Sequence, residues 1–315
     1  MFISFIVPAY NVESLVERCI DSICTQNLSP DKYEVVIIND GSTDNTLAVI
    51  NGLIAKYSNR KIVLIDKANG GLSSARNTGL AHASGKYVWF IDSDDYIADN
   101  CLEQIYQEIH NHNEFDLLAF NMEYAYDDGS VSQNKRRLAA KQYITGSELY
   151  LQDFRYPYSG VQFSIYRHSY LKSLGLLFKE GIVFEDILYT TLLLASNPKC
   201  LFIDSVYYHY SIRLGSITNS KSSVKKCLDL LLVADDLYSN IDATRYNRTV
   251  IYDQIARIVP LLYRYHMSGL CINDKIEVIK QILKRDYWHK AIMTSRKHKY
   301  IPYLLLNALL RPFIR

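Results

Sequence analysis

The chain has 315 residues, which is enough for one large domain or two of ordinary size. Hydrophobic residues make up 49% and charged residues 22%, a composition typical of folded globular proteins that argues against intrinsic disorder. The formal net charge of +2 gives no reason to expect nucleic-acid binding.

The first 115 residues alternate between short apolar segments and longer segments with helical periodicity. We expect strands at residues 3–8, 33–39, 62–66 and 87–91, and helices at residues 14–26, 42–56, 72–82 and 99–111. Strands that are apolar throughout and alternate with helices predict an α/β fold, with a mostly parallel sheet covered by helices on both faces. Such sheets bind ligands at the carboxyl ends of their strands.

The rest of the chain departs from this alternation. We expect a strand at residues 117–126, a polar and basic loop at 132–141, a helix at 180–196 and one or two strands within 201–210. From residue 222 to the end the pattern predicts helices with few glycines.

Nothing in the sequence predicts export or a membrane span. The first residues lack the basic start of a signal peptide, and no run approaches 18 apolar residues. The six cysteines are scattered and form no Cys-x-x-Cys pair, which argues against a zinc knuckle or a redox pair. The simplest expectation is a reducing, cytoplasmic compartment.

An acidic segment, Asp92-Ser-Asp94-Asp95, directly follows the fourth predicted strand. Three carboxylates in so short a segment repel one another and lower stability unless a cation is bound. Carboxylate oxygens suit Mg²⁺ or Mn²⁺, which would bridge a diphosphate and stabilise it as a leaving group. The alternative is an acidic turn in which Asp95 or Asp99 caps the next helix. The position of the segment among other polar strand ends favours the metal site.

Two more strand ends carry polar segments. At residues 39–44, Gly41 permits a tight turn and the hydroxyl and carboxyl side chains after it cap a helix. Asp40 is needed for neither task, and a carboxylate at this position could accept a hydrogen bond from a nucleotide base. Residues 69–77 are glycine-rich and open a helix, an arrangement that attracts phosphate, but they match neither a dinucleotide fingerprint nor a P-loop. Arg76 is either an exposed helix residue or a phosphate ligand.

Two later segments have open interpretations. Glu185 and Asp186 begin an apolar helix, where they either complement the helix dipole or supply a general base. His209 lies in a tyrosine-rich segment and is either a strand residue or a metal ligand.

Together these segments resemble glycosyltransferase family 2, whose members have the GT-A fold. The resemblance is carried, in order and spacing, by IVPAYN at 6–11, INDGSTD at 38–44, NGGLSSARN at 69–77, FIDSDD at 90–95 and FED at 184–186. It covers roughly residues 1–217 and looks most like the bacterial branch that builds capsular, exopolysaccharide or O-antigen units. It implies a GT-A domain at 1–217, with a nucleotide-binding half at 1–115 and an acceptor half at 116–217, followed by a helical C-terminal region at 218–315.

The resemblance also implies a donor site for a nucleotide diphosphate sugar, most often a UDP-sugar. Tyr10 would stack on the base, Asp40 would hydrogen-bond it, and Arg76 would approach the diphosphate. The full set of implied donor-binding residues is Pro8, Ala9, Tyr10, Asn11, Asp40, Asn69, Gly71, Arg76, Asp92, Ser93 and Asp94.

The same resemblance implies the chemistry. Asp94 would ligate Mn²⁺ or Mg²⁺, with Asp92 in the metal or ribose shell and His209 as a further ligand. Asp186 would be the general base of an inverting transfer, and Glu185 would position it or an acceptor hydroxyl. The family's late motif often has arginine where this chain has Ser211, whereas Arg213, Gly215 and Ser216 are retained, so the phosphate or acceptor contacts of this segment differ from the family pattern.

The C-terminal region predicts an interaction surface. Its last part is basic and ends in leucines and aromatic residues, and its cations are Lys284, Arg285, Lys290, Arg296, Lys297, Lys299, Arg311 and Arg315. This pattern suits a helix lying on an anionic membrane surface, or one docked on the body or on a second subunit as in a homodimer. The expected acceptor is a saccharide or a lipid-linked saccharide, and the enzyme would be cytoplasmic or peripheral at the inner face of the membrane.

Three other functions are alternatives to this one. A sugar nucleotidyltransferase would carry a glycine-rich, basic loop after the first strand, where this chain has Pro8–Asn11. A non-catalytic nucleotide-sugar binding protein need not retain both Asp94 and Asp186. A structural interaction module built on the C-terminal helices would lose its function when residues 222–315 are deleted, while turnover stays intact. The donor sugar, the acceptor and the oligomeric state do not follow from the sequence.

Overall fold

The computed structural model describes residues 1–112, 115–136, 138, 142–152, 160–213, 221–263 and 267–295. The chain forms two compact units. The first comprises residues 1–145, 152–181 and 198–214, and the second comprises 146–151, 182–197 and 215–315. The chain therefore passes between the units several times instead of completing one before starting the other.

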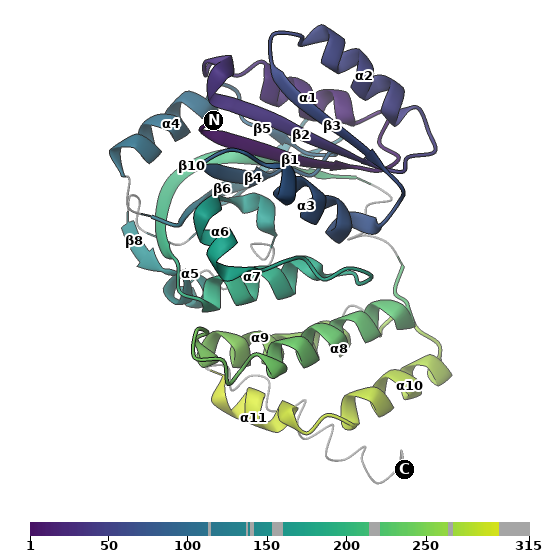
Figure 1. Cartoon of the computed structure of the whole chain (residues 1–315). Coiled ribbons are helices and arrows are strands. Elements are labelled where there is room, and N and C mark those ends of the chain that lie inside the picture. The colour runs from purple at the N-terminus through teal and green to yellow at the C-terminus, as the bar shows by residue number, and fades with distance from the viewer. Residues whose placement is uncertain are drawn as a thin grey trace. The chain divides into compact units, whose positions relative to one another are not determined.

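The first unit is built on one sheet, which has ten strands within the described residues (Figure 1). Their order is β3-β2-β1-β4-β9-β6-β10-β5, with β7 paired to β6 and β8 paired to β10. The strands are β1 (Ile3–Ala9), β2 (Tyr33–Asp40), β3 (Lys61–Lys67), β4 (Tyr87–Phe90), β5 (Tyr96–Ile97), β6 (Leu117–Tyr126), β7 (Val131–Asn134), β8 (Gln142–Thr145), β9 (Ser164–Arg167) and β10 (Lys199–Ile212).

The first four strands, β1 to β4, form the parallel half of this sheet. β1 pairs in parallel with β2 on one side and β4 on the other, and β2 pairs in parallel with β3. Beyond β4 the sheet is mixed, because β9 runs antiparallel to both β4 and β6 whereas β10 is parallel to β6. The predicted α/β fold is confirmed, and its parallel part is the half that the strand–helix alternation had indicated.

Helices cover both faces of the parallel half. One face presents Ile3, Phe5 and Val7 to a core shared with α1 (Val16–Cys24), α2 (Thr46–Lys56) and α4 (Cys101–Asn111). The other face is covered by α3 (Gly71–His82), with α6 (His168–Leu174) after β9 (Figure 1). Helix α3 lies so close to the sheet that a Cβ on Gly79 would come within 2.4 Å of Ile6 and 2.8 Å of Ile38. A glycine is therefore required for this approach.

The expectation of a loop at residues 132–141 is wrong for its first part. Residues 132–134 belong to β7, which pairs with β6 and is largely exposed. An exposed edge strand needs no buried alternate positions, so its sequence lacks the periodicity of a strand. Residues 137 and 139–141 lie outside the described part of the chain. Two 3₁₀ turns, at Pro30–Lys32 and Val161–Phe163, and the short strands β5, β8 and β9 were not predicted either.

A buried carboxylate joins the amino-terminal ends of the parallel strands. Glu34 Oε1 accepts hydrogen bonds from the Ser4 hydroxyl at 2.6 Å and from the amide and hydroxyl of Ser84, both at 2.7 Å. Its Oε2 lies 2.6 Å from Lys61 Nζ, and the Glu34 side chain is 1% exposed. Burial alone would raise the pKa of Glu34, but the bonds from Lys61, Ser4 and Ser84 outweigh it and lower the pKa to about 2.

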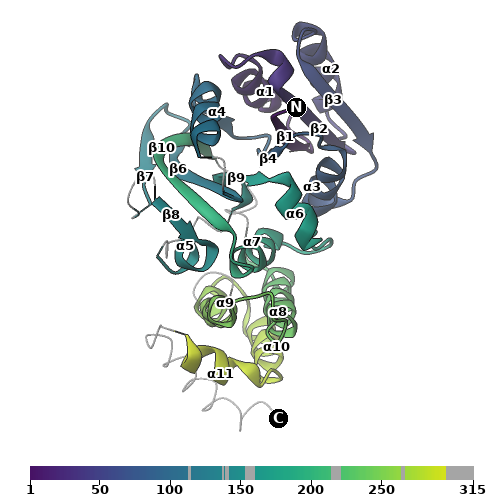
Figure 2. The same ribbon diagram turned by 60° about the vertical axis from the view of Figure 1, so that its left-hand side comes forward.

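The second unit is helical. It contains α5 (Gly146–Gln152), all but its last residue, with α7 (Glu185–Ala195), α8 (Val224–Ser239), α9 (Arg248–Leu261), α10 (Ile272–Leu283) and α11 (Tyr287–Thr294). Side chains cap two of them: Ser223 accepts from Lys226 N at the start of α8, and Asn247 accepts from Thr249 N at the start of α9. Helices α8 and α9 pack against α7 and each other, with α10 on α8 and α11 on α9 (Figure 2).

The outer helices are held by one aspartate of α8. Asp235 binds Arg285 through both of its oxygens, at 2.8 and 2.7 Å, and accepts a hydrogen bond from Tyr287 at 2.6 Å. The predicted helical C-terminal region is confirmed as far as residue 295, and the basic tail at 296–315 lies outside the described residues. Within the described residues, no helix is long and apolar enough to cross a membrane. All six cysteines lie within the described residues and none forms a disulfide; five are buried, and Cys271, the residue before α10, is exposed.

We predict that replacing Glu34 by Gln changes the acid stability of the protein. Because the pKa of Glu34 is about 2 in the folded protein against an ordinary 4.5, its stabilising effect is complete above about pH 4.5 and is lost as the pH falls toward 2. The difference corresponds to about 3 kcal/mol. Urea unfolding of both proteins from pH 7 to pH 3 measures it. The gap in unfolding free energy should be largest above pH 5 and should narrow below it, and a gap that stays constant with pH would contradict the assignment.

Candidate active site

The polar segments predicted at the strand ends meet at one edge of the sheet. In the strand order β1 lies between β2 and β4, and all three are parallel, so their carboxyl ends are neighbours. The segments that leave these ends begin with Tyr10 after β1, Gly41 after β2 and Ile91 after β4. This edge of the first unit is the candidate active site.

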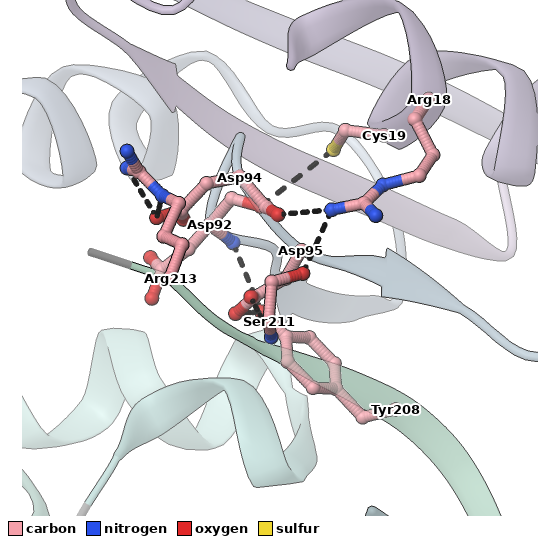
Figure 3. Close-up of polar contacts among 8 residues, drawn as sticks. All are labelled: Arg18, Cys19, Asp92, Asp94, Asp95, Tyr208, Ser211 and Arg213. Carbon is pink, nitrogen blue, oxygen red and sulfur yellow. Dashed lines mark hydrogen bonds and ion pairs between the residues drawn. The ribbon is translucent and has the colours of Figure 1, made fainter. Parts of the chain in front are cut away.

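The acidic turn, residues 92–95, is fixed by strand β10. The amide of Asp95 closes the turn by donating to the Asp92 carbonyl at 3.0 Å. The Tyr208 hydroxyl donates to Asp95 Oδ2 at 2.7 Å and accepts from the Asp92 amide at 3.2 Å, while the Ser211 amide donates to Asp95 Oδ1 at 2.8 Å (Figure 3). Tyr208 therefore links the two ends of the turn.

Within the acidic turn, Asp95 differs from its two neighbours in exposure. It is 2% exposed, and both of its oxygens accept from β10. Burial raises the pKa of Asp95, and the charges of Asp94 and Asp92 raise it further, although the bonds from Ser211 and Tyr208 act in the opposite direction. The side chains of Asp92 and Asp94 are 22% and 26% exposed, so these two carboxylates are the ones that solvent and ligands reach.

Three arginines from separate elements surround the acidic turn. Arg76 of α3 lies 2.7 Å from Asp92 Oδ1, and its guanidinium also lies over the ring of Phe178. Arg213, which follows β10, donates to Asp94 Oδ2 from Nε at 3.1 Å and from Nη2 at 2.7 Å.

The third arginine, Arg18 of α1, uses its guanidinium to contact the backbone of the turn. It donates to the Asp94 carbonyl at 2.9 Å and to the Ser211 hydroxyl at 2.8 Å (Figure 3). Its guanidinium also lies over the ring of Tyr96. Arg76 is only 2% exposed, so the interpretation of it as an exposed helix arginine is wrong.

His209 lies between a glutamate and a tyrosine ring. His209 Nδ1 lies 2.8 Å from Glu123 Oε1, and its ring stacks on Tyr96 with centroids 4.5 Å apart. Burial lowers the pKa of His209, although Glu123 acts to raise it. Its role as a metal ligand remains a prediction, and in the structure its ring contacts Glu123 and Tyr96. Ser93, within the turn, is buried.

Asp40 joins the second strand end to the glycine-rich segment. It is 3% exposed, and it accepts from the amides of Gly70 at 3.0 Å and Gly71 at 2.8 Å and from Lys67 Nζ at 2.6 Å. Its carbonyl accepts from the Asn69 side chain at 2.9 Å. Asp40 therefore has a structural role besides the turn and the cap considered in the sequence, because its carboxylate fixes the loop that opens α3.

The first strand end offers an exposed ring. Tyr10 is 49% exposed, whereas Pro8 and Ala9 are buried within β1. Asn11 has a φ of 51°, and its side chain accepts from the Thr43 amide at 2.8 Å. This bond holds the segment after β1 beside the one after β2, and it leaves the Tyr10 ring available for stacking.

The two predicted catalytic carboxylates lie in the second unit, at the start of α7. Phe184, immediately before the helix, has a φ of 71°. Glu185 is 7% exposed and Asp186 is half-buried. Of the two, Asp186 is therefore the carboxylate that solvent reaches more readily.

The acidic turn fits a divalent cation of a particular kind. Among the described residues, no cluster of three or more His, Cys, Asp or Glu side chains is arranged to hold a metal. Mg²⁺ and Mn²⁺ at phosphate sites commonly take only one or two carboxylates from the protein and the remaining ligands from phosphate and water. Two partly exposed carboxylates, paired with arginines, suit a cation that arrives with a diphosphate.

Several residues of this site were missed by the sequence analysis. Arg18 lies 76 residues from Asp94 and 193 from Ser211, and no local pattern marks it. Tyr208 lies in a segment noted for its aromatic residues, but its bonds to the turn depend on the pairing of β10 with β5. Lys67 ends β3 and lies between the strand expected at residues 62–66 and the glycine-rich segment at 69–77, so neither pattern included it.

Comparison with known proteins points to one family. A family model described as "Glycosyl transferase family 2" matches residues 4–175. An uncharacterised glycosyltransferase of Bacillus subtilis, EpsJ, is 32% identical over 225 residues, which are 69% of this chain and 62% of that protein. The Staphylococcus aureus poly(ribitol-phosphate) beta-N-acetylglucosaminyltransferase TarS is also 32% identical over 225 residues, 70% of this chain and 37% of TarS. The chain thus spans less than two thirds of these relatives.

Two solved structures have the same fold. A structure of TarS residues 1–349 in complex with UDP-GlcNAc has a TM-score of 0.72 and 23% identity, and the match covers 90% of this chain and 80% of that one. A mannosyltransferase of Pyrobaculum calidifontis in complex with GDP-Man and Mn²⁺ has a TM-score of 0.54 and 15% identity, covering 97% and 86%.

We predict that Tyr208→Phe weakens the acidic turn. The change removes the donor to the buried Asp95 carboxyl and the acceptor for the Asp92 amide, a loss of about 1–3 kcal/mol of stability. Urea unfolding at pH 7 measures it. The matched control is Tyr87→Phe, because the Tyr87 hydroxyl is buried without a hydrogen-bond partner in the described residues, and its removal should cost almost nothing. Equal losses in the two variants would contradict the role of Tyr208.

Proposed function

The chain belongs to glycosyl transferase family 2 and has the GT-A fold, and on that basis we propose that it is an inverting, metal-assisted glycosyltransferase. It would move a sugar from a nucleotide diphosphate sugar to a hydroxyl of a saccharide or lipid-linked saccharide. The observation that carries the proposal is the acidic turn at the carboxyl ends of β1, β2 and β4, with two accessible carboxylates and three arginines around it. Carboxylates are ligands for a divalent cation, and arginines pair with a diphosphate.

Relatives support the choice of a UDP-sugar and of surface polysaccharide as the product. TarS is named as a poly(ribitol-phosphate) beta-N-acetylglucosaminyltransferase, and its structure contains UDP-GlcNAc. A beta-linked product from such a donor is consistent with inversion. The Mn²⁺ in the structure of the Pyrobaculum calidifontis mannosyltransferase supports a divalent cation. Among bacterial surface polymers we propose a capsular, exopolysaccharide or O-antigen unit as the product.

In the donor site, each strand end has a proposed task. The exposed Tyr10 ring would stack on the base, and Asp40 would present the loop at residues 69–71 while accepting from the base. Arg76 would neutralise the diphosphate. Asp92 and Asp94 would hold Mn²⁺ or Mg²⁺, which supplies electrostatic stabilisation of the leaving diphosphate. His209 remains a candidate further ligand.

Asp186 is the proposed general base. An inverting displacement needs a carboxylate that takes the proton of the acceptor hydroxyl. Asp186 is more accessible than Glu185, which supports assigning the proton transfer to Asp186 and a positioning task to Glu185.

The remaining assignments complete the proposal. Residues 1–217 would form the catalytic domain, with a donor half at 1–115 and an acceptor half at 116–217. The helical region at 218–315 would associate with the membrane surface or with a second copy of the chain. The enzyme would work in the cytoplasm, at the inner face of the membrane when its acceptor is lipid-linked.

We predict a metal-dependent thermal shift with UDP. A ligand that binds only the folded state adds about 2.7 kcal/mol of stability at 100 times its Kd. Melting curves are compared for UDP, GDP and CMP, each with and without Mn²⁺. UDP with Mn²⁺ should give the largest shift, and the Mn²⁺-dependent part should disappear in Asp94→Asn.

The control for this variant is Asp99→Asn, which removes the same charge from an exposed position just after β5 and should keep the full shift. If none of the three nucleotides shifted the melting temperature, the support for a donor site would be lost and a non-catalytic function would be favoured. A shift that persists in Asp94→Asn would place the cation elsewhere.

We predict that Asp186→Asn lowers turnover by about 10²–10⁴-fold while the affinity for donor stays close to that of the wild type, because general-base catalysis contributes that much. UDP release from the preferred UDP-sugar measures turnover, and calorimetry with UDP and Mn²⁺ measures donor binding. Turnover within a few-fold of the wild type would show that Asp186 is not the base.

A further inference from the structure

The ion pair between Asp94 and Arg213 has a consequence for how the cation binds, provided that the proposed donor site is right. Both Nε and Nη2 of Arg213 converge on one oxygen, Asp94 Oδ2, at 3.1 and 2.7 Å (Figure 3). Asp94 is one of the two accessible carboxylates of the turn. Its charge is therefore already paired by a side chain before a metal arrives.

Arg213 is placed differently from the arginine at the other carboxylate. The side chain of Arg76, which pairs with Asp92, is 3% exposed and packs over Phe178, whereas that of Arg213 is 31% exposed and follows the last residue of β10. A partly exposed ion pair is worth about 1 kcal/mol or less, so a divalent cation can replace it. If a cation displaced Arg76 from Asp92, the Arg76 guanidinium would stay buried without that carboxylate, which is costly.

The electrostatics favour replacement of Arg213 only when an anion is also present. A divalent cation that takes Asp94 alone leaves the Arg213 guanidinium next to a 2+ charge, and like charges at such distances repel. A nucleotide diphosphate removes this repulsion, because it brings negative charge for both the cation and the guanidinium.

We propose that Arg213 is a resident counter-ion that competes with the cation for Asp94, so that the cation and the nucleotide diphosphate bind cooperatively. Arg213 holds the metal-binding carboxylate while the donor is absent and is transferred to the anionic donor when the cation binds. By linkage, the cation raises the affinity for the nucleotide by the same factor as the nucleotide raises the affinity for the cation. The site thereby favours the loaded state over a site holding the metal alone.

The test is a titration of the full chain with Mn²⁺ alone and with Mn²⁺ in the presence of saturating UDP, with free Mn²⁺ followed by electron paramagnetic resonance. Arg213→Gln should bind Mn²⁺ alone about 10-fold more tightly than the wild type, a factor within the usual range for coupling between sites. The factor by which UDP increases the affinity for Mn²⁺ should be smaller in this variant than in the wild type. It should remain above one, because the direct contact between cation and phosphate remains.

Two further variants distinguish competition between Arg213 and Mn²⁺ for Asp94 from an effect of the protein's net charge on Mn²⁺ affinity. Arg213→Lys keeps a cation that can pair with Asp94, so its affinity for Mn²⁺ alone should stay near that of the wild type. Arg60→Gln removes the same charge from a guanidinium that lies over the Tyr33 ring, and it should also leave Mn²⁺ affinity near the wild-type value. If Arg60→Gln raised the affinity as much as Arg213→Gln did, net charge would explain the effect and the proposal would fall.

The outcomes distinguish this proposal from the proposed function. Asp94-dependent binding of Mn²⁺ with UDP in the wild type, together with no gain in Arg213→Gln, would overturn the counter-ion role and leave the donor site standing. No Asp94-dependent binding of Mn²⁺ in any variant, with or without UDP, would overturn both.

Discussion

Repulsion among the carboxylates of the acidic turn is the constraint on which the candidate site depends. Three aspartates within four residues cannot all remain charged and buried. In the structure each of them has a different environment. Asp95 is buried, with a raised pKa and two donors from β10. Asp92 and Asp94 stay accessible and pair with arginines. The turn therefore draws in α1, α3 and β10, which are far apart along the chain, and the charges of the site also organise this edge of the fold.

Strand β5 makes this arrangement possible although it has only two residues. It follows the acidic turn directly and pairs antiparallel with β10, with Ile97 opposite Tyr208 and Tyr96 opposite His209. This pairing sets the register that brings the Tyr208 hydroxyl to both ends of the turn. A shift of one residue would turn Tyr208 to the other face of the sheet.

The sequence was sufficient to predict whatever depends on local periodicity. The strands that became β1 to β4, the helices between them and the polar segments at their carboxyl ends all follow from apolar spacing, whereas the N-cap expected at residues 42–44 was wrong, because α2 begins only at Thr46 and its N-cap is Asn45. It was insufficient for partners brought together by the tertiary fold. Arg18 contacts Ser211 across 193 residues, and Glu34 contacts Ser84 across 50. Asp40 shows the same limit, because its bonds to Gly70 and Gly71 arise only from the parallel pairing of β2 with β3.

The distribution of thiols makes the protein suitable for single-site chemical labelling. Maleimides and related reagents attack the thiolate, so a cysteine must be both accessible and able to ionise. Burial raises the pKa of Cys19, brings that of Cys24 to about 12 and that of Cys227 to about 11, and Cys101 and Cys200 are buried as well. Cys271, at the start of α10, is the exposed one. The unaltered sequence thus provides one attachment point for a fluorophore or spin label, located in the helical unit.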